Sequence, residues 1–353
     1  MDLIIKPTEA CNFKCTFCSS TAIDPDKAGL LDLDYVFRFL KRYPDTNSLI
    51  INGGDPLMVD PSYYWKIIEH LDEHDYPAHI SFTTNLWPFY VKPQKWVDLF
   101  NHDRMGICTS FQYGGGRLKG DLTEFTEEDF WAVSDAMLKY CGERPDFIAV
   151  LTDMNDYRAL DNVKLAKEMN VECKLNYAMA SGVQGTTYRL SKIYQLYLDV
   201  YDAGLHPWEF NTKQMMRRLK RGFTTCPQNR NCDEGIRAFN PGGDYYSCGS
   251  LADDLDYPIN FDEEMNGPMQ TPLQNDPNIQ TMKMACYTCP MFEICNGCKK
   301  TVRDMKREGT VEAHCRQMKN MAPRILELNG MDPKGVTPYV DESIDQPDLL
   351  LQL

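Results

Sequence analysis

Three cysteines near the start of the chain are the residues whose type and spacing predict chemistry most directly. Cys11, Cys15 and Cys18 form a C-x3-C-x2-C triplet that closely follows the apolar run Leu3–Ile5. Three thiolates at this spacing can hold three corners of a [4Fe–4S] cluster, for which cysteine is the normal ligand. The fourth iron then lacks a protein ligand, much as a catalytic zinc keeps one position open. The triplet predicts a reactive iron site, with a zinc knuckle or three unrelated thiols as the alternatives.

The triplet resembles the cluster-binding motif of the radical SAM superfamily. In that family the open iron chelates the amino and carboxylate groups of S-adenosylmethionine (SAM), and the reduced cluster cleaves SAM to methionine and a 5′-deoxyadenosyl radical. Phe17 fits the aromatic position that the family carries just before its third cysteine, beside the adenine. The resemblance therefore implies a cluster that binds SAM and an enzyme that starts its reaction with a radical.

Segments at the ends of the second, third and fourth expected strands resemble the SAM-contacting motifs of the same family. The segment Gly53–Pro56 corresponds to a Gly-Gly-Glu-Pro motif whose backbone receives the SAM ammonium group, with aspartate in place of glutamate. The segment that ends in Asn85 resembles Thr-Asn-Gly without its glycine. The segment Ser110–Gln112 resembles a Ser-x-Asp element that contacts ribose and methionine carboxylate, and glutamine in the aspartate position leaves the ribose contact open. The implied cofactor-binding residues are Gly53, Gly54, Asp55, Pro56, Asn85, Ser110 and Gln112.

Short β-rich runs alternate with amphipathic helical stretches over the first two hundred residues, which predicts βα units and a parallel sheet. Capping signals mark the helices, with Asp60-Pro61 at one start, and Thr126 and Gly142 at the two ends of another. Six βα units, the last closed by a helix near Leu190–Ala203, match the partial (β/α)6 barrel of radical SAM enzymes, an α/β fold. The candidate strands are Leu3–Lys6, Ser48–Asn52, His79–Thr84, Met105–Gln112, Phe147–Leu151 and Val171–Tyr177. Such barrels place their chemistry on loops at the carboxyl ends of the strands, where the triplet lies. We interpret the glycine-rich loop 113–117 as a hinge or substrate rim.

The regular alternation stops near residue 205, and clustered cysteines follow. We expect a barrel over residues 1–205, a small domain held together by metal over residues 206–331, and a loosely ordered tail over residues 332–353. The chain has 14 cysteines and no targeting segment, so metal ligation in the cytoplasm is favoured over disulfides. Its net charge of −14 disfavours nucleic acid as a partner, and no apolar stretch is long enough to span a membrane.

Eight cysteines lie between residues 226 and 315, enough for two fully ligated [4Fe–4S] clusters. Without the family context, the group at 286–298 fits a zinc ribbon equally well. The array resembles the SPASM domain that follows the barrel in many peptide- and protein-modifying enzymes, except that two residues instead of three separate Cys295 from Cys298. The resemblance implies one auxiliary cluster on Cys226, Cys232, Cys248 and Cys298, and another on Cys286, Cys289, Cys295 and Cys315.

Fully ligated clusters cannot bind SAM, so their expected role is electron transfer, which favours oxidative products such as crosslinks or dehydrogenated side chains. We therefore expect an oxidative modification of a peptide or protein. The expected partners are a separate leader-recognition protein and a reductant of flavodoxin or ferredoxin type. A small-molecule dehydrogenase of the aminocyclitol or sugar type is the alternative, and a zinc-binding interaction module is disfavoured because the SAM-type strand ends would then serve no purpose.

Two further features bear on the reaction type. Cys108 is expected to face the barrel interior, where a thiol could return a hydrogen atom to a substrate radical as an epimerase requires, but core packing is favoured. Sulfatase-maturing members of the family carry a basic aspartate directly after the cysteine that corresponds to Cys248. This chain has Gly249 there, and nothing in the sequence selects among Asp253, Asp254 and Asp256 nearby.

Overall fold

Alternating strands and helices form the first part of the chain, as expected. The computed structural model describes residues 1–20, 29–216, 232–275, 277 and 298–332. They form two compact units: Met1–Val150 with Ser181–Gly185 and Asp233–Pro272, and the described remainder. The first unit contains β1 (Asp2–Ile5), α2 (Leu33–Arg42), β2 (Ser48–Ile51), α3 (Pro61–Glu73), β3 (His79–Thr83), α4 (Trp87–Val91), α5 (Val97–Phe100), β4 (Met105–Ser110), α6 (Glu127–Cys141) and β5 (Asp146–Leu151) up to Val150.

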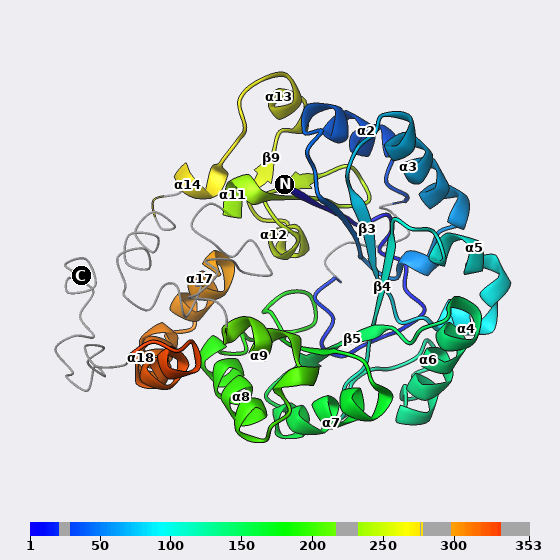
Figure 1. The fold of residues 1–353 in the computed structure, drawn as a ribbon. Coiled ribbons are helices and arrows are strands. Elements are labelled where there is room, and N and C mark those ends of the chain that lie inside the picture. Colours follow the sequence, from blue (N-terminus) through cyan, green and yellow to red (C-terminus); the bar gives the residue numbers. More distant parts are fainter. Residues whose placement is uncertain (21–28, 217–231, 276, 278–297, 333–353) are drawn as a thin grey trace. The chain divides into compact units, whose positions relative to one another are not determined.

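A parallel sheet is the centre of the first unit. Strand β1 pairs with β2 in parallel, β2 with β3, β3 with β4, and β4 with β5. Helices α2, α3, α5 and α6 lie along the outside of these strands (Figure 1). The rings of Tyr64 on α3 and Phe82 on β3 are 4.6 Å apart, so the apolar face of the helix packs on the sheet. The α/β architecture of a partial TIM-type barrel is thus confirmed.

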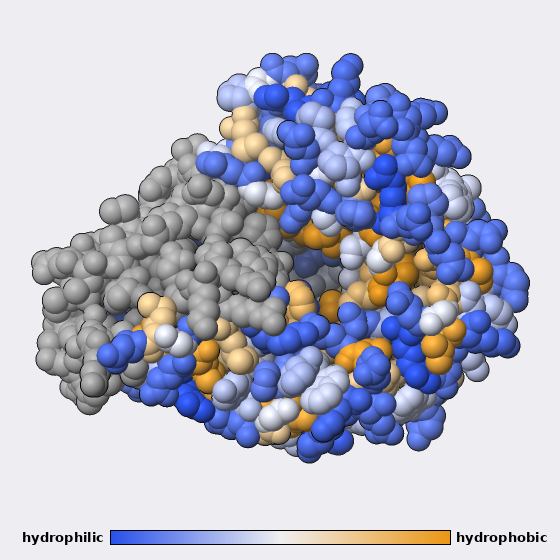
Figure 2. All heavy atoms as spheres, viewed as in Figure 1, coloured by the Kyte–Doolittle hydropathy of each residue, from blue (hydrophilic) through white to orange (hydrophobic). Residues whose placement is uncertain are grey.

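Local capping explains where two of these helices begin and end. Asp60 is the N-cap of α3, and its side chain accepts a hydrogen bond from the Ser62 N–H. Pro61 occupies the first position of the helix. At α6, Thr126 and Asp129 form a reciprocal capping box, and Gly142 with φ 87° ends the helix. All of these signals are present in the sequence, and the structure confirms them. On the face drawn in Figure 2, the outer surface over α2 and α3 is largely hydrophilic, which fits helices whose apolar sides face the sheet.

A strand from beyond residue 205 extends this sheet, which the sequence did not predict. Strand β7 (Ile236–Phe239) pairs in parallel with β1, and β8 (Tyr245–Tyr246) and β9 (Pro258–Ile259) continue in antiparallel fashion. Helices α12 (Gly249–Asp254) and α13 (Phe261–Asn266) complete the segment. The rings of Tyr35 on α2 and Phe239 on β7 lie 5.8 Å apart, so the helix that covers β1 also reaches the added strand.

The second unit contains further βα elements and two helices near its carboxyl end. They are α7 (Ala159–Met169), β6 (Cys173–Tyr177), α8 (Leu190–Asp202), α9 (Phe210–Met215), α17 (Lys299–Arg307) and α18 (Val311–Leu328). The buried Glu209 side chain accepts hydrogen bonds from the backbone N–H groups of Leu175, at 2.9 Å, and of Thr212. Two short helices, α11 (Cys232–Gly235) and α14 (Pro272–Asn275), lie where the chain passes between the units.

The expected strands all form, with ends that differ by one or two residues. Strand β6 begins at Cys173 instead of Val171, because the Val171 N–H donates to the Ala166 carbonyl at the end of α7. Strand β4 ends at Ser110 instead of Gln112. The domain boundaries at residues 205 and 331 stay predictions, and the expected tail lies almost wholly outside the described residues. None of the helices in the described part of the chain has the length and apolar character needed to cross a membrane.

Candidate functional site

The cysteine triplet lies on a loop that leaves the carboxyl end of β1 and pairs with a second loop. The Lys14 N–H donates to the Leu118 carbonyl and the Thr16 N–H to the Gly116 carbonyl, both at 2.8 Å. A Cβ at Gly116 would lie 2.7 Å from Thr16 Oγ1, so this close pairing requires glycine. The loop after β4, which the sequence suggested to be a hinge or substrate rim, therefore supports the triplet loop.

Burial and nearby charges act on the thiols of the triplet. Burial raises the pKa of Cys11 to about 12, with Asp55 as the next cause, and the other two thiols of the triplet contribute. Burial also raises the pKa of Cys18. The three thiols are therefore close enough to influence one another electrostatically, and thiols of this kind are the normal ligands of iron–sulfur clusters.

Gly53 and Gly54 allow the second strand's loop to approach the triplet loop. A Cβ at Gly54 would lie 2.3 Å from the Ala10 carbonyl oxygen, and one at Gly53 2.5 Å from the Thr8 carbonyl oxygen. Gly53 also has φ 112°, a conformation that favours glycine. The family resemblance assigns the backbone of this loop to the SAM ammonium group. The structure shows that the two glycines also serve a close approach of backbone to backbone, with the Gly54 N–H donating to Thr8 O at 3.0 Å.

The buried carboxylate of Asp55 links the ends of two strands by hydrogen bonds. Its carboxylate accepts hydrogen bonds from the Leu57 N–H at 2.9 Å, from Thr84 Oγ1 at 2.9 Å, and from the Asn85 N–H at 2.8 Å. Burial raises the pKa of Asp55 to about 6, although these hydrogen bonds oppose the shift. Pro56 follows it at the start of a short 3-10 helix. The carboxylate thereby joins the Gly-Gly-Asp-Pro loop to the end of β3.

Asn85 connects the end of β3 to the triplet loop. Its Nδ2 donates to Asn12 Oδ1 at 2.8 Å, and its own Oδ1 accepts from the Trp87 N–H at 2.9 Å. Asn12 is the residue directly after the first cysteine of the triplet. The structure thus brings together three of the sequence motifs, at the ends of β1, β2 and β3.

Arg117 is the site residue that sequence analysis missed. It is 6% exposed, and its guanidinium lies over the Phe17 ring at 5.3 Å. Its Nη1 donates to Ser110 Oγ and its Nη2 to Gln112 Oε1, both at 2.8 Å. Burial lowers the pKa of Arg117, while the thiols of the triplet oppose that shift, which places the three cysteines within electrostatic reach of the cation. The signal available in the sequence is an arginine directly after a glycine run at a strand end.

Ser110 and Gln112 both accept hydrogen bonds from Arg117. Both were expected at the end of β4, and both are buried there. Gln112 stands where the family motif has an acid, and its Oε1 accepts from the arginine while its Nε2 donates to the Gly115 carbonyl at 3.2 Å. Together with Phe17, the two side chains hold the guanidinium in place, which leaves a fixed positive charge beside the triplet.

A cluster of charged side chains lies within electrostatic reach of Cys18. Lys6 Nζ forms an ion pair with Asp253 of α12 and lies 3.6 Å from Glu9 Oε1. Asp253 and Glu9 both contribute to the raised pKa of Cys18, after burial and Cys15, so their charges reach that thiol. Asp254 instead accepts a hydrogen bond from Ser181 Oγ at 2.6 Å. Of these two neighbouring acids, Asp253 is therefore the one whose charge acts on the triplet.

Gly249 has a packing reason to lack a side chain. A Cβ there would lie 2.9 Å from Ile4 Cδ1, so an aspartate at this position would require Ile4 to move. Asp253 lies four residues later on α12, on the same helical face one turn along. The helix thus presents a carboxylate from position 253 instead of from position 249.

Only part of the expected auxiliary-cluster set can be placed. Cys226, Cys286, Cys289 and Cys295 lie outside the described residues, and so does the side chain of Cys232. Cys248 precedes α12, Cys298 precedes α17, and Cys315 lies in α18; all three are half-buried. Cys108 is half-buried on β4, with its Sγ 3.5 Å from the Thr109 carbonyl oxygen.

Comparison with known proteins agrees with this geometry. Residues 5–107 match the model of the Radical SAM superfamily, and this range contains the triplet, the Gly-Gly-Asp-Pro loop and Asn85. This part of the chain is therefore similar to the radical SAM superfamily. No curated protein sequence matches the chain at the significance required.

Solved structures resemble this chain over most of its length. Native anSMEcpe with bound AdoMet (SAM) aligns with a TM-score of 0.68 at 16% identity, over 93% of this chain and 99% of that one. Native anSMEcpe with bound AdoMet and the Cp18Cys peptide gives 0.67 at 16%, over 93% and 98%. Streptococcus suis SuiB bound to the precursor peptide SuiA gives 0.56 at 16%, over 86% and 72%. At these identities the likeness establishes the shared fold.

The radical SAM family implies a [4Fe–4S] cluster and SAM, and the residues present fit both. Three half-buried thiols supply the donors, and a buried guanidinium offers a positive charge within electrostatic reach of them. Loop–loop hydrogen bonds hold the thiol-bearing segment in place from two sides.

Proposed function

We propose that the chain is a radical SAM enzyme that oxidatively modifies a peptide or protein. Cys11, Cys15 and Cys18 would hold the [4Fe–4S] cluster, and a cluster with SAM bound supplies reductive SAM cleavage and radical hydrogen abstraction. The observation that carries the proposal is the buried guanidinium of Arg117, which is fixed by Ser110 and within electrostatic reach of all three thiols. A peptide substrate is supported by the likeness to anSMEcpe and SuiB, both solved with peptides.

Each side chain of the site has a role in this proposal. Arg117 would bind an anionic group of SAM, for which the methionine carboxylate is the natural partner, because a guanidinium binds carboxylates with strong charge-assisted bonds. Phe17 would lie beside the adenine, and the end of β4 would carry the ribose contacts. Asp55 and Asn85 act by joining the loops, since their polar atoms are occupied by hydrogen bonds within the protein.

An oxidative outcome rests on the cysteines after residue 225. Hydrogen abstraction leaves a substrate radical, and loss of one electron and one proton from that radical gives the oxidised product. In the proposal, the cysteines after residue 225 would hold auxiliary [4Fe–4S] clusters that supply an electron acceptor, and Asp253 of α12 would accept the proton. Asp253 is supported by its ion pair with Lys6 and by the reach of its charge to Cys18. A flavodoxin- or ferredoxin-type reductant in the cytoplasm and a separate leader-recognition protein would complete the system.

The test combines metal analysis with product mass. We expect about twelve irons and as many sulfides per chain after anaerobic reconstitution, the content of three four-iron clusters. We expect a product about 2 Da lighter than its peptide substrate, because oxidation by one hydrogen atom, one electron and one proton removes two hydrogens. About four irons together with zinc, or a product whose mass equals that of the substrate, would contradict the oxidative proposal.

The same assay on Asp253→Asn tests the proton acceptor. General-base removal typically costs about 10²–10⁴-fold in rate, so product formation should fall by that order while iron content and SAM cleavage without product persist. Asp254→Asn, whose carboxylate bonds Ser181, is the matched control and should retain most of the product. Equal yields from both variants would remove Asp253 from the proposal.

A further inference from the structure

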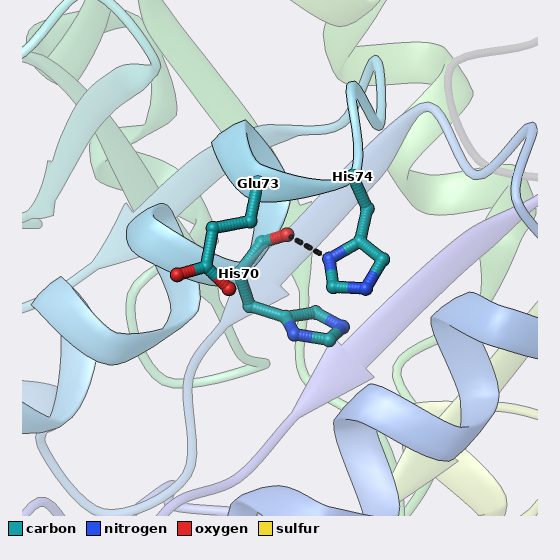
Figure 3. A group of neighbouring side chains, drawn as sticks. All are labelled: His70, Glu73 and His74. Carbon is teal, nitrogen blue, oxygen red and sulfur yellow. Dashed lines mark hydrogen bonds between the residues drawn. The ribbon is translucent and has the colours of Figure 1, made fainter.

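A second group of metal-type donors lies on the outer helix α3, in the first unit. His70, Glu73 and His74 each offer one donor atom, and these atoms all lie within 4.8 Å of one another. Residues three and four apart on a helix share a face, which is why the three side chains gather at one end of α3 (Figure 3). Helix α3 starts after the carboxyl end of β2 and ends before β3, so the group lies at the opposite end of these strands from the cysteine triplet.

The two imidazoles are held in orientations suited to metal binding. His74 Nδ1 lies 3.0 Å from the His70 carbonyl oxygen, drawn as a dashed line in Figure 3. A carbonyl only accepts hydrogen bonds, so Nδ1 carries the proton, and the Nε2 lone pair of His74 is left available. His70 Nε2 is buried without a hydrogen-bond partner. A buried polar atom without a partner is costly, and a metal ion would satisfy it.

Aromatic rings fix the pair from both sides. The Phe37 ring stacks on His70 with centroids 4.0 Å apart, and Tyr76 stacks on His74 at 5.4 Å. The two histidine rings are themselves 4.3 Å apart. Ligands whose side chains are already ordered lose less conformational entropy when the ion binds. The exposed Glu73 is the mobile member that could close onto the ion.

Electrostatics favour a cation at this position. The C-terminal end of a helix carries partial negative charge, and His74 is the C-cap of α3. Donors around one zinc ion sit about 3.3 Å apart when each bond is about 2.05 Å. Rotation of the exposed Glu73 side chain can bring its carboxylate closer to the two imidazoles.

We propose that His70, Glu73 and His74 form a binding site for a divalent transition ion of the zinc class. Two imidazoles and a carboxylate suit such ions, with water in the fourth position of a tetrahedral site. The site is independent of the cysteine-bound clusters and of the reaction proposed above. It would join the end of α3 to the segment that leads into β3.

The test uses untagged protein with its iron–sulfur clusters reconstituted, so that the thiols are already ligated. Zinc bound after equilibrium dialysis at micromolar Zn²⁺ is measured by elemental analysis, beside iron. We expect one zinc per chain that is absent from the His70→Gln/His74→Gln variant. The affinity should fall by at least ~100-fold, the upper end of losses seen when only outer-shell partners are removed.

Two controls keep the outcome decisive. His79→Gln alters a histidine at the exposed start of β3, outside the group, and should keep the zinc. Glu73→Gln changes an exposed side chain that cannot affect folding much, and should weaken binding while iron content is unchanged. Equal zinc in the wild type and the double variant would overturn the site, as would zinc binding that Glu73→Gln does not weaken.

Discussion

The positive guanidinium of Arg117 lies within electrostatic reach of the three cysteines, which are negative when they bind a cluster as thiolates. The arginine donates to Ser110 and Gln112 and lies over Phe17, so its position does not depend on a ligand. A cluster on three thiolates is negatively charged, and a buried cation beside it offsets part of that charge. Because the guanidinium has five donors, bonds to the protein leave others for a carboxylate.

We predict that Arg117→Gln weakens SAM binding by about 10- to 100-fold, because a hydrogen bond to a charged group contributes roughly 1.5–3 kcal/mol. Arg117→Lys should fall in between, since lysine keeps the charge but loses the planar fork. SAM binding to the reconstituted protein, measured anaerobically, checks this, with iron content confirming the cluster. Arg144→Gln is the matched control, an arginine paired with Asp135 on the surface. Unchanged affinity in Arg117→Gln would remove the residue from the SAM site.

Individual site residues were predictable where they belong to a local motif. The triplet, Gly53, Gly54 and Asp55 occupy short continuous segments, so their resemblance to the family's motifs could identify them. Arg117 was missed because its role depends on the pairing of its loop with the triplet loop, a contact across about a hundred positions that no local pattern reveals. Asp253 could not be separated from its neighbour because the choice depends on which acid meets Lys6.

At the scale of elements, the hydrophobic alternation of β1 to β6 and the capping signals of α3 and α6 predicted the barrel. Strand β7 escaped prediction because it is short, interrupts a glycine- and aspartate-rich region, and has Arg237 at its second position. That arginine is fully buried, which is rare unless the charge is paired. Its partner is 27 residues away on α13, so the sequence offers no periodic signal for the strand.

Glu264 of α13 is that partner and is central to the added part of the sheet. Its carboxylate accepts from Arg237 Nε at 2.9 Å and Nη2 at 3.1 Å, and also from the Tyr245 hydroxyl at 2.9 Å. Although burial opposes the shift, Arg237 lowers the pKa of Glu264. A lowered pKa in the folded state means that this stabilisation is present above the ordinary glutamate pKa of 4.5 and is lost as the pH falls below it.

We predict that Glu264→Gln lowers the free energy of unfolding by about 3–5 kcal/mol, because it leaves the Arg237 guanidinium buried without its counter-charge. Urea unfolding of the reconstituted protein, followed by far-UV circular dichroism at neutral pH, provides the measurement. Glu263→Gln, one residue earlier on the exposed side of α13, is the control and should change stability little. A loss in Glu264→Gln no larger than in the control would show that the ion pair does not stabilise β7 and α13.

At the scale of the whole molecule, the proposed auxiliary clusters would depend on residues far apart in the chain. Cys248 precedes α12, Cys298 precedes α17, and 50 positions separate them in the sequence. The SPASM resemblance assigns both to one auxiliary cluster, while the shortened spacing between Cys295 and Cys298 departs from the SPASM pattern. Sequence spacing cannot resolve this, because cluster ligation depends on where separate segments meet.

Iron counts in single and double variants decide whether the two cysteines share a cluster. We predict that Cys248→Ser and Cys298→Ser each lose about four of about twelve irons. The double variant should lose no more than either single one, because two ligands of one cluster act as a unit and their effects are not additive. Cys141→Ser, on α6 and outside every proposed ligand set, should keep all its iron. If Cys248→Ser loses four irons and Cys298→Ser none, Cys298 is not a ligand, and the cluster's fourth ligand must come from elsewhere.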